Sequence, residues 1–293
     1  MTTDAEHTYW SEPGALRSRL AELPSEPRML PDALENFLIH HAVARYMNLG
    51  VPAQAESDRD LRTVVRLLDR LTRRDGRHLS EHRALPDYLY GTCHDFALLA
   101  TSVLREAGVP ARLRVGCASY FRPGYWDDHW ICEYRRGLGW AVLDAQLGPR
   151  ARTGFGIGFD VSDVPADGWR PAAAIWRAIR AGTVDERICG LTNIGIEGRW
   201  FVASAVLRDA AALAGIETLP WDYWGPGHAF RETRQVSPEQ ARDIDALAAA
   251  LDPAPAGREE AEAVLARFTW ARPTPTVWSL PEGRPTEDVR IRP

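Results

Sequence analysis

The amino-acid sequence predicts an α+β fold, and three observations carry this prediction. Residues 92–107 have the pattern of a buried helix, because residues 96–104 contain no charged side chain. Strand candidates follow this helix directly, at residues 112–120, 129–134 and 140–146. Beyond Gly148 the sequence becomes Ala-rich, which favours further helices.

Changes in amino-acid composition and periodicity along the chain divide it into four parts. Residues 1–30 contain several prolines and show only weak periodicity, so we expect an N-terminal arm. The α+β core, preceded by helices, is expected over residues 31–150, and a helical C-terminal extension over residues 151–270. Residues 271–293 are Pro-rich and are expected to form an extended tail.

Two helices are predicted ahead of the core helix. Over residues 31–49 apolar side chains recur at helical spacing, and Gly50 follows as a stop signal. The second helix is expected to start at Ser57, where Asp60 completes an approximate capping box, and to end near Gly76. Both helices should lie on the surface of the core.

Stop and start signals set the remaining elements. Gly108 and Pro110 end the core helix. The Gly-rich segment GFGIGFD after Gly148 is interpreted as a connector, because it lacks the strand–helix frame and the spacing of a dinucleotide-binding loop. Helices are predicted at residues 170–181, 200–214, 238–251 and 258–268.

The composition narrows the class of protein. Of the 293 residues, 45% are hydrophobic and 26% are charged, which is typical of a soluble globular protein. The net charge of −5 gives no reason to expect a nucleic-acid or anionic-membrane partner. No apolar run approaches the roughly 18 residues of a membrane span, and the acidic N-terminus is unlike a signal peptide, so a cytoplasmic location is expected.

Cys93 is the first candidate for chemistry, because it stands where the core helix begins. Unpaired N–H groups and the positive end of the helix dipole favour an anion there, and the thiolate is the reactive form of cysteine. Gly91 lets the backbone turn tightly just before it and lets a substrate approach. Taken alone, a cysteine at this position is more often structural than catalytic.

A histidine and an aspartate in the following hairpin supply the partners of a nucleophile. If Tyr134 pairs with Gly139 in the segment HWICEYRRGLGWAVLDAQ, His129 lies opposite Asp144. Cross-strand neighbours have Cβ atoms about 4.5–5.5 Å apart, so the carboxylate would hold one imidazole nitrogen and direct the other outward. A slip of one residue would put the two side chains on opposite faces.

These segments resemble the transglutaminase-like superfamily. The runs GTCHDFALL and LREAGVPARLRVG are similar to its cysteine helix and following strand, and HWICEY and GWAVLDAQ to its histidine and aspartate strands. The resemblance covers about residues 88–148 and implies a papain-like fold, with the cysteine helix packed on an antiparallel sheet. It implies that Cys93 is the nucleophile, His129 the base and Asp144 the orienting carboxylate.

The expected reaction is acyl transfer through a thioester on Cys93. The acyl donor is expected to be a peptide or a small molecule, and the acceptor an amine or water. The sequence therefore does not decide between two reactions. One is amide formation, and the other is hydrolysis by a cysteine protease, amidase or deamidase with the same triad. All 35 basic residues are Arg, so the chain cannot cross-link itself through lysine amines, and a reaction on a peptide or small metabolite is preferred. The rival of another class is a non-catalytic binding module on the same fold.

Aromatic residues are candidates for the cleft. Tyr90 is a weak candidate for an oxyanion donor beside the Cys93 N–H, with packing as its alternative role. Trp130 stands where the family often has Ala. The remaining candidates precede His129 or lie in the aromatic segment 219–230, which is expected to be a loop that anchors a domain or forms a pocket wall: Tyr125, Trp126, Trp221 and Trp224.

No metal or cofactor is expected. Cys117, Cys132 and Cys189 show no CxxC spacing and are interpreted as small buried side chains. Asp127 and Asp128 either attract a cationic substrate group or end the strand in solvent. The sequence does not set the oligomeric state.

Overall fold

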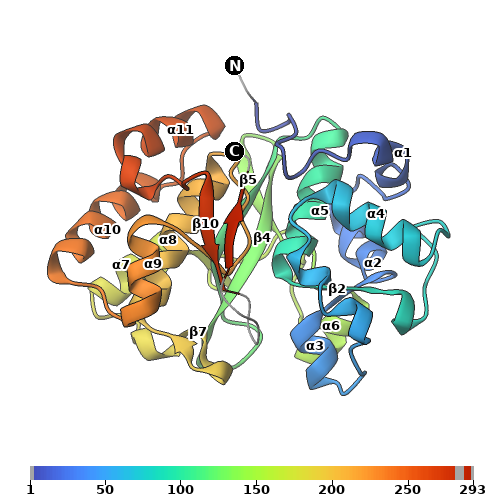
Figure 1. Ribbon diagram of the computed structural model, residues 1–293, viewed down its shortest axis with the longest axis horizontal. Coiled ribbons are helices and arrows are strands. Elements are labelled where there is room, and N and C mark those ends of the chain that lie inside the picture. Colours follow the sequence, from blue (N-terminus) through green and yellow to red (C-terminus); the bar gives the residue numbers. More distant parts are fainter. Residues whose placement is uncertain (1–2, 281–286, 292–293) are drawn as a thin grey trace. The chain divides into compact units, whose positions relative to one another are not determined.

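A computed structural model describes residues 3–280 and 287–291, and its chain forms two compact units (Figure 1). The Cys93 unit contains residues 4–113 and 131–165, and the His129 unit contains residues 3, 114–130, 166–280 and 287–291 of the described chain. Two strands run through both units: β3 (Ala111–Ala118) and β4 (Trp126–Arg136). The units therefore do not follow the order of the sequence.

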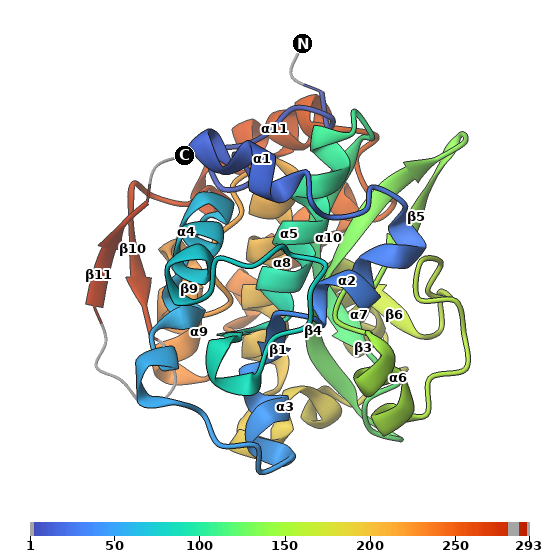
Figure 2. The ribbon, with the colours of Figure 1, turned by 90° about the vertical axis from the view of Figure 1, so that its right-hand side faces the viewer.

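The Cys93 unit is built around helix α5 (Cys93–Glu106), in which every residue from Cys93 to Arg105 is buried. This confirms the prediction from its uncharged sequence. Helix α4 (Val64–Arg74) contacts α5 (Figure 2). Its buried side chains form one stripe, made of Val64, Leu67, Leu68 and Leu71. The other helices and strands of this unit are α1 (Arg17–Leu20), α2 (Leu30–Leu34), β1 (Leu38–His40), α3 (His41–Tyr46), β2 (Leu89–Gly91), β5 (Gly139–Leu143) and α6 (Pro149–Phe155).

The predicted helix over residues 31–49 is wrong, because α2, β1 and α3 share this segment. Phe37, Leu38 and Ile39 form a continuous buried run, which is typical of a buried strand rather than of an amphipathic helix. Strand β1 pairs in parallel with β2, Ile39 lying opposite Tyr90. This pairing fixes the chain immediately before Cys93.

The predicted helix start at Ser57 is also wrong, since α4 begins at Val64 and residues 58–60 form a 3₁₀ turn. Asp58 points inward instead of capping a helix. Its fully buried carboxylate accepts hydrogen bonds from Arg70, from Arg74 and from the Tyr90 N–H. The carboxylate thus connects α4 to β2.

The segment from residue 4 to residue 30 packs against α5. The Ser11 carbonyl accepts a hydrogen bond from Ser102, and the Ser11 hydroxyl accepts one from Arg105. Trp10 and Leu20 are buried. Short 3₁₀ turns at Gly14–Leu16 and Pro27–Met29 complete this segment.

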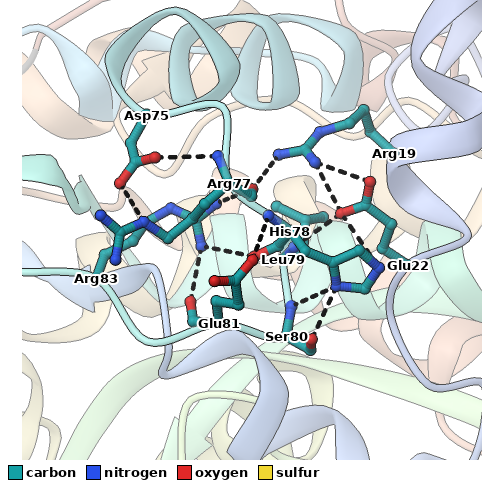
Figure 3. Close-up of polar contacts among 9 residues, drawn as sticks. All are labelled: Arg19, Glu22, Asp75, Arg77, His78, Leu79, Ser80, Glu81 and Arg83. Carbon is teal, nitrogen blue, oxygen red and sulfur yellow. Dashed lines mark hydrogen bonds and ion pairs between the residues drawn. The ribbon is translucent and has the colours of Figure 1, made fainter.

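A polar network holds the loop between α4 and β2 (Figure 3). Arg19 donates to Glu22 and to the Arg77 carbonyl, and Glu22 accepts the Leu79 N–H. The buried guanidinium of Arg83 donates to the carbonyls of Arg77 and Glu81. Since this loop leads into β2, the network helps to position the approach to Cys93.

The His129 unit is centred on α8 (Arg199–Leu213), which is buried from Trp200 to Leu213. Four helices contact it (Figure 1): α7 (Ala172–Arg180), α9 (Gly225–Thr233), α10 (Pro238–Leu251) and α11 (Arg258–Arg267). The predicted helices at 170–181, 200–214, 238–251 and 258–268 are thus confirmed within two residues.

Three more strands of this unit extend the sheet in the order β6-β3-β4-β7-β8. They are β6 (Trp169–Pro171), antiparallel to β3; β7 (Cys189–Leu191), parallel to β4; and β8 (Ile196–Glu197), antiparallel to β7. A separate small sheet joins β9 (Asp222–Tyr223), β10 (Thr276–Ser279) and β11 (Glu287–Arg290). The aromatic segment 219–230 is therefore not a loop, because it forms β9 and the first turns of α9.

Short 3₁₀ turns complete the described chain. In the Cys93 unit they lie at Ala53–Ala55, Asp58–Asp60 and Leu85–Asp87, and in the His129 unit at Glu186–Ile188, Thr192–Ile194 and Thr269–Ala271. Among the described residues, no helix has both the length and the apolar character needed to cross a membrane.

Candidate active site

Cys93 is the first helical residue of α5, directly after the N-cap residue Thr92. The Thr92 N–H donates to the Asp95 carboxylate at 2.7 Å, and the Thr92 hydroxyl donates to the same oxygen at 3.2 Å. The Cys93 side chain is 6% exposed. Its sulfur therefore lies at the positive end of a well-ordered helix, where a developing thiolate is stabilised.

Gly91 is required by close packing rather than by an unusual backbone angle. A Cβ atom at this position would lie 2.6 Å from an Asp95 carboxylate oxygen and 3.0 Å from a Leu38 methyl carbon. Any side chain would displace either the cap of α5 or strand β1. The glycine thus lets β2 approach the start of the cysteine helix.

Replacement of Asp95 by alanine removes the acceptor that ties Thr92 to the first turn of α5. We expect a loss of about 1 kcal/mol in the free energy of unfolding, as for other helix caps. Urea denaturation measures this loss. Asp95→Asn is the matched control, because its amide oxygen still accepts the Thr92 N–H, and it should lose less. Equal stability of Asp95→Ala and the unmodified protein would contradict a capping role.

His129 lies in the middle of β4 with its ring held by aromatic neighbours. The ring meets Phe121 edge-on at a centroid distance of 4.8 Å and an interplanar angle of 80°, and Tyr120 at 6.1 Å and 86°. The His129 carbonyl accepts a hydrogen bond from the Trp169 indole at 3.1 Å. These contacts fix both the ring and the backbone of the candidate base. Sequence reasoning missed all three partners, since nothing in the local pattern ties them to the histidine.

Neither aspartate before His129 ends the strand in solvent, because both lie within β4. Asp127 is paired with Arg122, which stacks on the ring of Tyr125. The Asp128 Oδ1 atom is buried and has no hydrogen-bond partner within residues 3–280 and 287–291. Burial raises the pKa of Asp128 to about 6, against an opposing attraction from Arg208 and His129.

The pKa of Asp128 makes its replacement pH-dependent. Between about pH 4 and pH 6 the unfolded chain releases this proton while the folded protein keeps it, so the stability of the unmodified protein falls across that window and the full cost is present above about pH 6. Asp128→Asn should therefore gain stability relative to the unmodified protein as pH rises from 4.5 to 7.5, by about 2 kcal/mol. Urea denaturation at both pH values measures this.

Asp185→Asn is a control of opposite sign for this experiment. Hydrogen bonds from Arg187 lower the pKa of Asp185 to about 2, so its charged form stabilises the folded state. Removing that charge should cost nearly the same stability at pH 4.5 and at pH 7.5, because the folded and unfolded pKa values bound a window at about pH 2–4. A gain for Asp128→Asn that is independent of pH would contradict the buried, proton-retaining carboxyl.

Asp144 directly follows β5 and is buried. Its Oδ1 atom accepts the Gln146 N–H at 3.0 Å, and its own N–H donates to the Val161 carbonyl. The expected hairpin register is wrong by two residues, since Tyr134 pairs with Ala141 and Arg136 with Gly139. The tip is tighter than expected, because only residues 137 and 138 form the turn. Continued in this register, position 144 aligns with residue 131 rather than with residue 129.

A two-residue shift keeps the alternation of side chains along both strands. Glu133 lies opposite Val142, and the two side chains share a face of the hairpin. Glu133 accepts hydrogen bonds from Arg112 at 2.8 Å, and Arg112 stacks 3.9 Å from the centre of the Trp140 ring. The Glu four residues after the candidate base is thus part of a buried ion pair.

The candidate catalytic residues are divided between the units. Cys93 and Asp144 belong to the Cys93 unit and His129 to the His129 unit. Tyr90 is buried, and its hydroxyl donates to the Leu85 carbonyl at 3.0 Å, which favours the packing role over that of an oxyanion donor. It packs with Ile39, Ala44, Ala55 and Tyr88.

The other aromatic candidates all belong to the His129 unit. Tyr125 is 39% exposed, Trp126 opens β4 under the guanidinium of Arg170, and Trp130 is buried in β4. Trp224 is buried and donates its indole N–H to the Ala271 carbonyl at 2.8 Å. The Trp221 indole N–H has no acceptor in the described part of the chain.

The remaining cysteines, Cys117, Cys132 and Cys189, are buried, as predicted, and none of them forms a disulfide within the described residues. Burial raises the pKa of Cys189 to about 12 and holds the pKa of Cys117 well above its usual value. Cys132 lies in β4 with no exposed surface. These thiols are therefore protonated or shielded at neutral pH, which makes Cys93 the cysteine best placed to react.

One model of a known protein family matches a segment of the chain. Residues 42–145, roughly a third of the chain, match the model of the Transglutaminase-like superfamily. The chain thus carries a transglutaminase-like domain, and this supports membership of a family of cysteine enzymes in general. The matched region contains Cys93, His129 and Asp144. No curated protein and no solved structure matches the chain.

Proposed function

We propose that the protein is a cysteine-dependent acyl-transfer enzyme that works through a thioester on Cys93. His129 is the general base and acid, and Asp144 orients its imidazole. The observation that carries the proposal is the position of Cys93 at the capped start of a buried helix, inside the segment that matches the Transglutaminase-like superfamily.

Acylation begins when the Cys93 thiolate attacks the carbonyl carbon of an amide, ester or thioester. The carbon–sulfur bond forms, the bond to the leaving group breaks, and His129 returns a proton to that group. N–H groups in the first turn of a helix lack intrahelical partners, so the Cys93 N–H is a donor for the negative oxygen of the tetrahedral intermediate.

Deacylation reverses these steps with a second nucleophile. An amine or water attacks the thioester carbon, His129 takes the proton, and the thiolate leaves. An amine gives a new amide, and water gives a carboxylic acid. The absence of lysine from this sequence favours a reaction on a separate peptide or small molecule over cross-linking of the chain to its own copies.

Alkylation with iodoacetamide from pH 5 to pH 9 separates the enzyme from a binding module on the same fold. We expect one fast, selective modification, on Cys93, well below the pH at which an ordinary thiol reacts, and a slow rate in His129→Ala. Cys189→Ala is the matched control and should still take up one label quickly. Modification at the rate of an ordinary thiol, unchanged in His129→Ala, supports the binding module.

Intact-mass spectrometry then tests the thioester itself. Incubation with a set of activated acyl donors should give a mass increase on Cys93 that disappears when an amine is added. Recovery of the amide product identifies a transferase, and recovery of the acid alone identifies a hydrolase. No adduct with any donor on a fast-reacting Cys93 would contradict the acyl-transfer proposal.

A further inference from the structure

Arg208 is a buried cation without an acceptor. It lies in the middle of α8 and is 1% exposed, yet none of its three guanidinium nitrogens has a hydrogen-bond partner among the described residues. A guanidinium carries five N–H donors, and leaving such a charge buried and unpaired is costly. Its neighbour Asp209 shows the usual solution, because it binds Arg114 through two hydrogen bonds of 2.9 Å.

The surroundings of Arg208 form a pocket within the His129 unit. Its lining residues are Ser204, Leu207, Arg208, Asp222, Tyr223, Trp224 and Gly227. The guanidinium carbon lies 5.3 Å from the centre of the Tyr223 ring and 5.5 Å from that of Phe201. Aromatic faces attract a cation but offer no oxygen to its N–H groups.

The polar groups that line the pocket already serve other residues. The Ser204 hydroxyl donates to the Trp200 carbonyl at 3.0 Å, and Asp222 accepts the Leu219 N–H at 2.9 Å. Asp128 acts on Arg208 electrostatically, without a hydrogen bond. What Arg208 lacks is therefore a pair of acceptor oxygens placed in this pocket.

We propose that the pocket binds the carboxylate of a small monocarboxylic acid, with Arg208 as its two-pronged donor. A planar carboxylate matches the fork of a guanidinium and provides both missing acceptors. A carboxylate carries a single negative charge and is therefore repelled less by Asp222 and Asp128 than a phosphate dianion would be. The apolar body of the acid would lie against Leu207 and the rings of Tyr223 and Trp224.

The pocket is narrow. The space between its lining atoms is about 130 Å³, a figure that includes the part open to solvent, and no water molecule fits there in this conformation. A lining side chain must therefore move when the ligand enters. Gly227 leaves part of the space, since a Cβ atom there would lie 3.1 Å from Leu207 and 3.9 Å from both Ser204 and Tyr223.

This pocket is separate from the His129 ring. Consecutive residues of a strand point to opposite faces, and Asp128, the residue that interacts with Arg208, directly precedes His129 on β4. The carboxylate site thus lies on the other side of the strand. Its ligand need not be the acyl donor or the acceptor of the proposed reaction.

Fluorine NMR of trifluoroacetate, displaced by acetate or propionate, tests the site on the full chain. We expect saturable binding that phosphate and the neutral ester methyl acetate do not displace. Arg208→Met should weaken it at least about tenfold, because hydrogen bonds to a charged group are lost. Gly227→Ala should weaken it similarly by filling the space while keeping the charge. The control is Arg187→Ala, which removes an exposed arginine.

A measurement of the stability of Arg208→Met shows whether a loss of binding comes from a folding defect. Arg208→Met removes an unpaired buried charge, so the variant should unfold at the same or a higher urea concentration than the unmodified protein. Should it fail to fold, Gly227→Ala alone decides the outcome. Absence of saturable binding, equal binding by Arg208→Met and Gly227→Ala, or stronger binding of phosphate than of carboxylates would overturn the proposal.

Discussion

Replacement of Asp209 by alanine is expected to lower the free energy of unfolding by about 3–5 kcal/mol, the usual cost of removing one partner of a buried ion pair. Asp209 lies on α8 and has no exposed surface. It accepts two hydrogen bonds from Arg114 and a third, of 2.8 Å, from the Val115 N–H. The variant removes these three hydrogen bonds and the negative charge that faces the buried Arg114 guanidinium.

The exposed pair of Arg187 and Asp185 provides the matched control for this experiment. Exposed ion pairs contribute about 0–1 kcal/mol, so Arg187→Ala should change the unfolding midpoint little. The double variant Asp209→Ala, Arg114→Met should recover part of the loss, because the buried positive charge is removed together with the carboxylate. Urea denaturation measures all three. A loss below about 1 kcal/mol for Asp209→Ala would show that water or another acceptor compensates Arg114.

Replacement of Cys93 by alanine is expected to abolish turnover of any acyl donor that the protein proves to accept. His129→Ala should lower kcat by about 10²–10⁴, the range for loss of general acid–base catalysis, and Asp144→Asn by a comparable factor. Because the three groups act together, the double variant His129→Ala, Asp144→Asn should be little worse than His129→Ala alone.

Matched controls separate catalysis from a loss of folding. His228 is a partly exposed histidine on α9, and Cys189 is a buried thiol on β7. His228→Ala and Cys189→Ala should keep kcat within about twofold once their folding is confirmed by circular dichroism. Turnover that survives in Cys93→Ala would move the nucleophile elsewhere. Additive effects of His129→Ala and Asp144→Asn would argue against a shared triad.

The sequence predicted those helices best whose ends carry capping residues or a helix-ending glycine. Helix α10 begins at Pro238 and ends at Leu251 as predicted, because Ser237 and Gln240 form a capping box. Helix α5 was predicted equally well from its uncharged centre and from the glycine after its last turn. In both helices the start signal comes from hydrogen bonds within a few residues.

Elements set by distant partners were not predictable in this way. Strand β1 exists because Leu38 and Ile39 pair with a strand about fifty residues later, and a short apolar run does not distinguish this from a helix. The register of the β4–β5 hairpin depends on whether its turn has two residues or four. The residues of this turn do not distinguish the two lengths clearly. For the candidate site, the sequence predicted on which elements Cys93, His129 and Asp144 lie. It could not predict that Phe121 packs on His129 or that Arg208 has no hydrogen-bond partner among the described residues, because both depend on tertiary contacts.

Strands β3 and β4, which each pass through both units, bear on how far the chain can be shortened. A polypeptide cut to residues 42–145 would keep both strands but lose β6 and β7, which pair with them. Its exposed edge strands would have unpaired N–H and C=O groups, which can pair with strands of other molecules. The carbonyl of residue 129 would also lose the hydrogen bond from the Trp169 indole. Truncation to the recognisable segment would therefore yield aggregates rather than a minimal enzyme.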